Sequence, residues 1–256
     1  MSSRTQLAPS RKRRTAQEKG GEAGAAAQEI HEADRKKRPR RGDRVSAEGQ
    51  EDETTAGDPS KCLETDRVVL FSGAEHFCSS SFPSAFRISA ASPESTRAEP
   101  AACAGDDDRT YFHVDQYLEA AKARLFRDHA TLQRVLGSPS ADMCKKWGRR
   151  VRNYDGPAWD RAARGVMARA LSAKFHDNPE LGRLLLGTGD RAIAEASSDR
   201  VWGIGRRCHH KEALDPARWA ANGSLNWLGQ LLEQTRAELA VEGSSEETPS
   251  ASAEQG

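Results

Sequence analysis

The chain has 256 residues, of which 30% are charged and 36% hydrophobic, and its formal net charge is +1 at pH 7. Its mean hydropathy of -0.78 is too polar for a globule that packs throughout, so we expect one domain of ordinary size with unfolded extensions, rather than two small domains. No apolar run is long enough to cross a bilayer, and the N-terminal arginines precede no apolar segment of the kind that a secretory signal requires.

Residues 1–65 are predicted to form a disordered basic tail, because residues 1–60 offer almost no aliphatic or aromatic side chains to bury. Two basic clusters, Arg11–Arg14 and Arg35–Arg41, are typical of nuclear localisation signals and of nucleic-acid-binding segments. The other interpretation is a solvated tail that carries no localisation signal. The clusters favour nucleic acid as a partner and a nuclear or cytoplasmic location, with no attachment to a membrane.

The five cysteines are odd in number and widely spaced, so they indicate neither a disulfide framework nor a metal-binding pair. A reducing compartment, cytosol or nucleus, fits this usage best. The one clustered set is Cys208-His209-His210, and adjacent ligands rarely reach a common tetrahedral centre. We therefore expect a polar loop there and predict no metal and no other cofactor.

Order is predicted over residues 66–241. The apolar run Val68–Phe71 predicts a strand, and Arg87–Ile88 a second short one. Residues 89–109 return to Ala, Ser, Pro, Glu and Asp, which predicts a flexible insertion within the domain.

From Tyr111 onward the pattern is helical, since apolar residues recur at the spacing of one helix face, at Val114, Leu118, Ala121 and Leu125. The rest of the domain is predicted to be mainly α, an α+β fold with a few short strands. In chain order we expect helices at 129–136, from a Ser140 cap to 151, at 158–175 and at 179–186, an edge strand at 191–195, a helix at 224–240, and a disordered tail at 242–256.

Several blocks occur in the order typical of one known family. They are YFHVDQYLEAAKA at 111–123, GRRVR at 148–152, LLGTGD at 185–190, WGIG at 202–205 and NWLG at 226–229. Together they resemble the NADAR (YbiA-like) family over residues 68–240. That family carries Glu-His-Tyr-Phe-Gln-Ala and a following lysine on its signature helix.

The resemblance implies a single NADAR-type helical domain and an N-glycosidase that hydrolyses the bond between a ribose and a nitrogenous base. Two substrate classes belong to the family: guanine modified by ADP-ribose, and the ribosylamino-pyrimidine phosphates of riboflavin biosynthesis. It also implies a catalytic lysine on the signature helix, which forms a Schiff base with the opened ribose. Lys122 stands at that position.

Asp115, Glu119 and Lys122 are spaced i, i+4 and i+7, so they share one helix face. A carboxylate can stabilise an oxocarbenium-like transition state or transfer a proton, and a neutral amine can attack the anomeric carbon. This spacing alone favours salt bridges, and it is the resemblance of the surrounding blocks that leads us to predict Lys122 as the nucleophile, Asp115 as its catalytic helper and Glu119 as a substrate-binding residue. Salt bridges on the protein surface are the alternative interpretation of this spacing.

Further substrate-binding residues are predicted in the other blocks. Trp202, beside Gly203, is the first candidate for stacking on the base, whereas Trp159 and Trp227 are expected to pack in the core. The remaining predicted substrate-binding residues are Arg149, which can neutralise a phosphate, together with Ser80 and Asp190.

The chain departs from the family pattern at three places. Asp115-Gln116 replaces Glu-His, and the loop at 89–109 is long. The family's Ser-Asn-Phe motif corresponds to Ser79-Ser80-Ser81 or, with a shift of one residue, to Ser80-Ser81-Phe82, so its asparagine amide is missing. A shorter carboxylate can misplace a reacting group, and glutamine does not titrate near neutral pH. The alternative function is therefore a catalytically weakened module that binds ADP-ribose or NAD. An interaction protein that is recruited through its basic tail is the third hypothesis.

Overall fold

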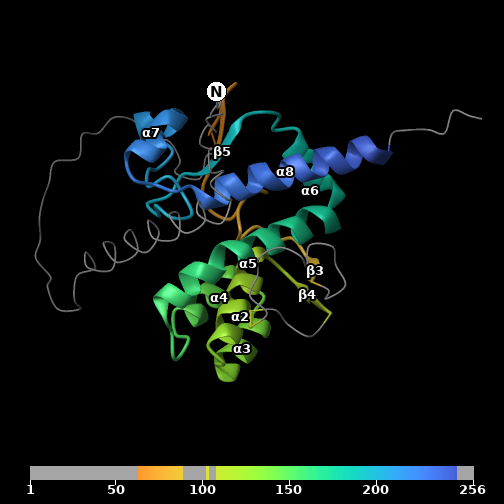
Figure 1. Cartoon of the computed structure of the whole chain (residues 1–256), viewed down its shortest axis with the longest axis vertical. Coiled ribbons are helices and arrows are strands. Elements are labelled where there is room, and N and C mark those ends of the chain that lie inside the picture. Colours follow the sequence, from red (N-terminus) through yellow and green to blue (C-terminus); the bar gives the residue numbers. More distant parts are fainter. Residues whose placement is uncertain (1–62, 89–101, 104–107, 247–256) are drawn as a thin grey trace, which may run out of the picture.

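The computed structural model describes residues 63–88, 102–103 and 108–246 (Figure 1). Helices predominate among these residues and the strands form two small sheets, which confirms the predicted mainly α fold class. Most of both predicted tails and most of the predicted insertion lie outside the described residues. The domain boundaries therefore stay predictions.

The first sheet has the strand order β1 (Leu63–Glu64), β2 (Val68–Phe71) and β5 (Ala192–Glu195). β2 and β5 run parallel, with Val69 opposite Ile193. All four residues of β2 are buried, as expected for a continuous apolar run in a strand that is covered on both faces. The predicted strand at 68–71 and the predicted edge strand near Ile193 are confirmed. The sequence did not predict β1, because two residues are too few to show the alternation of apolar and polar side chains that is typical of a strand.

The second sheet pairs β3 (Phe86–Ile88) with β4 (Arg109–Tyr111) in antiparallel register. The two strands flank the insertion, and the rings of Phe86 and Tyr111 stack with centroids 5.9 Å apart. The sequence did not predict β4, because we placed residues 109 and 111 at the end of the insertion and the start of a helix. That helix begins only at Val114, after His113 accepts a hydrogen bond from the backbone N–H of Gln116 as its N-cap.

Every predicted helix is present, with changes at some of its ends. The helix that was predicted from the Ser140 cap to 151 ends at Gly148 instead, and the C-terminal helix runs past the predicted domain end into the first residues of the predicted tail. A 3₁₀-helix and the short helix α7 were not predicted, because four and six residues are too few to show a helical period. The helices are α2 (Val114–Leu125), α3 (His129–Leu136), α4 (Ala141–Gly148), α5 (Gly156–Asp177), α6 (Pro179–Leu186), η2 (Lys211–Leu214), α7 (Pro216–Ala221) and α8 (Trp227–Glu246).

α2 is buried on nearly all sides, because α3, α4 and α5 all pack against it. Figure 1 shows these helices together, with α5 crossing the middle of the molecule and α8 on its other side. The burial of α2 includes its polar residues Asp115, Gln116 and Glu119. Both ends of the Gln116 side-chain amide form hydrogen bonds within the fold. Its Oε1 accepts the Phe112 N–H at 2.9 Å, and its Nε2 donates to the Ser138 carbonyl at 3.0 Å.

α5 fixes the segment after β2 through a buried lysine. The Lys174 side chain is fully buried, and its Nζ donates to the carbonyl oxygens of Phe77 at 2.7 Å and Ser79 at 2.9 Å. Burial lowers the pKa of Lys174 to about 8. This contact ties the loop of residues 77–82 to the centre of the domain.

None of the described helices combines the length and apolar composition that spanning a membrane would require.

Replacing Lys174 with Met should lower the free energy of unfolding by about 1–3 kcal/mol, because two buried carbonyl oxygens lose their donor. The unfolded chain binds more protons than the folded one between the lowered pKa of Lys174 and the ordinary lysine pKa. The stability difference between wild type and variant should therefore widen as pH rises from 8 toward 10.5. Urea denaturation across this pH range measures both effects.

The matched control is Lys146→Met, since Lys146 is exposed on α4. Its effect should stay within about 0.5 kcal/mol. Equal stabilities of wild type and Lys174→Met would contradict the anchoring role of Lys174.

Candidate functional site

A cavity of about 860 Å³ opens at the carboxyl edge of the parallel pair β2 and β5. Open α/β sheets commonly bind ligands at this edge, where the loops that follow the strands diverge. Its walls come from the segment after β2, the turn before α2, the start of α4 and the last residue of β5. The lining residues are Gly73, Ala74, Ser79, Ser81, Pro83, Ser84, Ala85, Phe112, His113, Pro139, Ser140, Ala141, Asp142, Lys145 and Glu195.

A three-residue network joins the wall of this cavity to α2. The Ser81 hydroxyl donates to Asp115 Oδ2 at 2.6 Å, and Lys145 Nζ lies 2.9 Å from the same oxygen and 2.7 Å from Ser81 Oγ. Asp115 is 3% exposed, whereas 36% of the Lys145 side chain is exposed. The structure therefore places Asp115 directly behind two residues that line the cavity. Its N–H also donates to the Ser80 carbonyl at 3.0 Å.

Lys122 and Glu119 form a second, separate ion pair one turn further along α2. Lys122 Nζ lies 2.5 Å from Glu119 Oε2, and the side chains are only 12% and 9% exposed. The ammonium also lies 5.0 Å from the centre of the Trp159 ring. The pair is therefore sheltered and is not an ordinary surface salt bridge. Lys122 is not among the residues that line the cavity.

The Glu119 carboxylate lies directly against Gly148, the last residue of α4. A Cβ at position 148 would come within 1.6 Å of Glu119 Oε2, so only glycine leaves room for the pair. Burial raises the pKa of Glu119, while the charge and hydrogen bond of Lys122 act in the opposite direction. The raised pKa favours a proton on the Glu119 carboxyl.

Glu195 is a site residue that the sequence analysis did not single out. It ends β5 and lines the cavity. Burial raises its pKa to about 7, the nearby Asp199 adds to the shift, and Lys145 opposes it. A carboxyl that titrates near neutral pH in a cavity is a candidate general acid or base. Only the position at the carboxyl end of a strand could have indicated it in the sequence.

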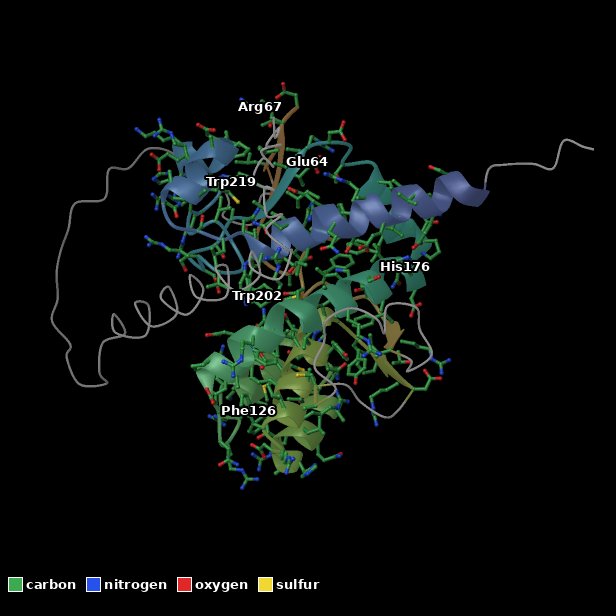
Figure 2. All side chains as sticks on the ribbon, viewed as in Figure 1. Glu64, Arg67, Phe126, His176, Trp202 and Trp219 are labelled. Atoms are coloured by element: carbon green, nitrogen blue, oxygen red, sulfur yellow. The ribbon has the colours of Figure 1, made fainter. Side chains whose placement is uncertain are left out.

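Trp202 and Gly203 lie in a loop that folds back onto β5. The backbone N–H groups of Val201 and Trp202 both donate to Asp199 Oδ1, at 2.7 and 2.9 Å. A Cβ at Gly203 would lie 2.6 Å from the Glu195 carbonyl oxygen, so the close approach requires glycine. Trp202 is half-buried and meets Trp227 edge-on at 5.6 Å, and it does not line the cavity. Figure 2 shows Trp202 near the middle of the molecule, close to α5.

The other predicted binding residues are spread out. Ser80 is half-buried between the cavity-lining Ser79 and Ser81. Arg149 is exposed at the C-cap of α4, and Asp190 is exposed ahead of the N-terminal end of β5, away from Glu195. The structure thus brings Ser80 and Asp115 to the cavity region but leaves Asp190 at the other end of the strand.

No group of three His, Cys, Asp or Glu side chains in the described part of the chain could hold a metal ion. In the Cys208–His210 segment, His210 Nδ1 accepts the Glu212 N–H at 3.2 Å and caps η2. His209 is exposed.

The sequence profile of the NADAR domain matches residues 70–240, which is most of the chain and all of the site. The chain belongs to the NADAR family. A similar NADAR protein is N-glycosidase R617 of Acanthamoeba polyphaga mimivirus, 31% identical over 183 residues that cover 69% of this chain and 98% of the viral protein. N-glycosidase YbiA of Escherichia coli (strain K12) is 28% identical over 137 residues, covering 53% of this chain and 75% of YbiA.

The NADAR fold is also supported by a solved structure. The NMR structure of E. coli YbiA superposes with a TM-score of 0.51 at 23% identity, and the match covers 75% of this chain and 95% of YbiA. This likeness confirms a YbiA-like fold. Gln116 occupies the position of the histidine in the NADAR signature, and its side-chain amide is hydrogen-bonded to the backbone of Phe112 and Ser138.

Replacing Gly148 with Ala should displace Glu119 from Lys122, since the new methyl group cannot share space with the carboxylate. We expect a loss of about 1–3 kcal/mol of stability and faster acylation of Lys122 by an amine-reactive reagent, followed by mass spectrometry. Gly243→Ala is the control, because a Cβ there meets nothing within 4 Å. Unchanged labelling of Lys122 in Gly148→Ala would contradict the proposed packing of the pair.

Proposed function

We propose that this protein is an N-glycosidase that hydrolyses the bond between a ribose and a nitrogenous base at the cavity beside β5. Guanine modified by ADP-ribose is the first proposed substrate, and the phosphoribosylamino-pyrimidine intermediates of riboflavin biosynthesis are the second. Membership of the NADAR family supports the proposal, as do two relatives that are named N-glycosidases.

The observation that carries the proposal is the placement of two acids of different character at one cavity. Asp115 is hydrogen-bonded to Ser81 and paired with Lys145, whereas the raised pKa of Glu195 favours a bound proton near neutral pH. Glycoside cleavage needs both: a negative charge to stabilise the oxocarbenium-like transition state, and a proton for the leaving group.

Lys122 is the proposed nucleophile, and because its side chain does not line the cavity, the proposal requires a movement that brings its amine to the bound ribose. Its ammonium passes a proton to Glu119, with which it is in contact, and the neutral amine attacks C1 of the ribose. The bond between C1 and the base nitrogen breaks, and the base leaves with a proton from Glu195. The ribose then opens to a Schiff base on Lys122, with a proton on the ring oxygen. Water adds to C1 and restores the free amine and the sugar.

Substrate binding is proposed to use the groups around these acids. Lys145 and the hydroxyls of Ser79 and Ser81 offer donors inside the cavity for a phosphate or a ribose. Trp202, with Gly203, is proposed to stack on the base after a movement of its loop, and Arg149 to attract the phosphates from outside.

Chemical trapping of the Schiff base tests whether Lys122 is the nucleophile. Incubation with ADP-ribosylated guanosine and sodium cyanoborohydride should reduce the Schiff base to a secondary amine, and peptide mass spectrometry should find the sugar adduct on Lys122. Lys122→Arg keeps the charge but should lose the adduct and about a thousandfold or more in turnover.

Lys145→Arg is the matched control, because it retains the pair with Asp115 and the adduct on Lys122. An adduct on Lys145 would move the nucleophile into the cavity wall. Absence of released base from either substrate class would overturn the enzymatic proposal. Calorimetric binding of ADP-ribose without turnover would instead establish the binding module.

The pH profile tests Glu195. As a general acid Glu195 must be protonated, so kcat/KM should fall as pH rises through about 7. Glu195→Gln cannot donate a proton and should lower kcat/KM about a hundredfold below pH 7, with the fall near pH 7 abolished. An unchanged profile in this variant would remove Glu195 from the mechanism.

A further inference from the structure

Positive charge is concentrated at one end of the domain. Residues 127–154 contain seven arginines and lysines against two aspartates, although the whole chain has a net charge of only +1. This segment covers α3, α4 and the turn that follows α4. Figure 1 places these helices at the lower end of the molecule, with α7 at the other end.

Two of the seven cations are neutralised by partners. Arg152 pairs with the buried Asp128 at 3.0 Å, and Lys145 pairs with Asp115. The other five are exposed and form no salt bridge with another described residue, and four of them lie on α3, on α4 or directly after α4. These four residues, Arg134, Lys146, Arg149 and Arg150, are called here the α3–α4 basic surface.

Trp147 gives this surface a fixed shape. The guanidinium of Arg134 lies 4.7 Å from the centre of its ring and that of Arg150 lies 5.4 Å from it. Stacking on an indole restricts both arginine side chains and leaves their N–H groups for an outside acceptor. Two guanidinium groups held beside two further cations suit a polymer of closely spaced phosphates better than a single carboxylate.

We propose that the α3–α4 basic surface binds the phosphate backbone of a single nucleic-acid strand. α4 connects this surface to the cavity, because Ala141 and Lys145 line the cavity while Lys146 and Trp147 follow on other faces of the same helix. A strand that crosses α4 can therefore present a base to the cavity. A single strand is favoured because a base inside a duplex cannot enter such a cavity without being flipped out.

The claim that the bound strand carries the reacting base rests on the proposed N-glycosidase function. The claim that the surface binds a strand does not, since phosphate contacts need no catalysis.

Fluorescence anisotropy with a labelled, unmodified 20-nucleotide single-stranded DNA tests the surface, with the full chain over a series of salt concentrations. The test variant is R134Q/K146Q/R149Q/R150Q. The control, R183Q/R207Q/K211Q/R218Q, removes the same charge from exposed residues of α6 and of the η2 and α7 region. Both keep the basic N-terminal segment, so its contribution is equal in the two proteins. Thermal unfolding checks that both are folded.

The test variant should bind the strand at least about tenfold more weakly at 0.1 M salt. Its plot of log K against log salt should be shallower by roughly 3, since each phosphate contact on a single strand contributes about 0.7. The control should stay within about twofold of wild type. If the test variant does not fold, the single variants Lys146→Gln and Arg149→Gln replace it, each with a slope change near 0.7.

Three results would overturn the proposal: equal losses in test and control variants, no loss in either, or equally tight binding of poly-glutamate with the same dependence on the four cations. Tighter binding of duplex than of single strand would overturn the single-strand assignment. A wild-type protein that binds DNA through this surface but releases no base would disprove the enzymatic function and leave the surface standing. Turnover by the wild-type protein, with no effect of the four substitutions on DNA binding, would support the enzymatic function and disprove the role of the surface.

Discussion

The burial of α2 on nearly all sides is the constraint on which the rest of this structure depends. A helix that packs against three others cannot leave a polar side chain without a partner, because each unpaired buried group costs about 1–3 kcal/mol. Asp115 and Gln116 therefore engage neighbouring elements, and Glu119 pairs with Lys122 of α2 itself. The same packing that stabilises the domain also arranges its charged groups.

Two ion pairs result from this constraint, Asp115 with Lys145 and Glu119 with Lys122, and they differ in their access to the cavity. The Asp115 pair reaches the cavity through Ser81 and Lys145, whereas the Glu119 pair with Lys122 lies against Trp159 and Gly148 and does not line the cavity. A nearly buried pair in which burial raises the pKa of the acid is closer to sharing a proton. The proposed chemistry uses the first pair as a fixed charge and the second as a source of neutral amine.

The departures from the family signature are accommodated by the same packing. Asp115 is shorter than glutamate, and the Ser81 hydroxyl and Lys145 ammonium meet it at hydrogen-bond distance. Gln116 replaces a histidine, and its amide completes the backbone hydrogen bonding at the end of α3 and before α2. Lys174 of α5 donates hydrogen bonds to the carbonyl groups of Phe77 and Ser79, and these bonds anchor the loop that carries Ser81 to α5. The site is thus supported by α5 as well as by α2.

The sequence by itself determined the longer helices, the strands β2, β3 and β5, and the family, because the apolar period of a helix and the order of the blocks are properties of neighbouring residues. Only the tertiary structure decided which charges meet. Ser81 and Asp115 are 34 residues apart and Ser81 and Lys145 are 64 apart, so no local pattern could pair them. The sequence did not indicate the proposed role of Glu195 for the same reason. Its raised pKa comes from burial at the end of β5 beside Asp199 and Lys145, and burial is set by the elements that pack around a residue.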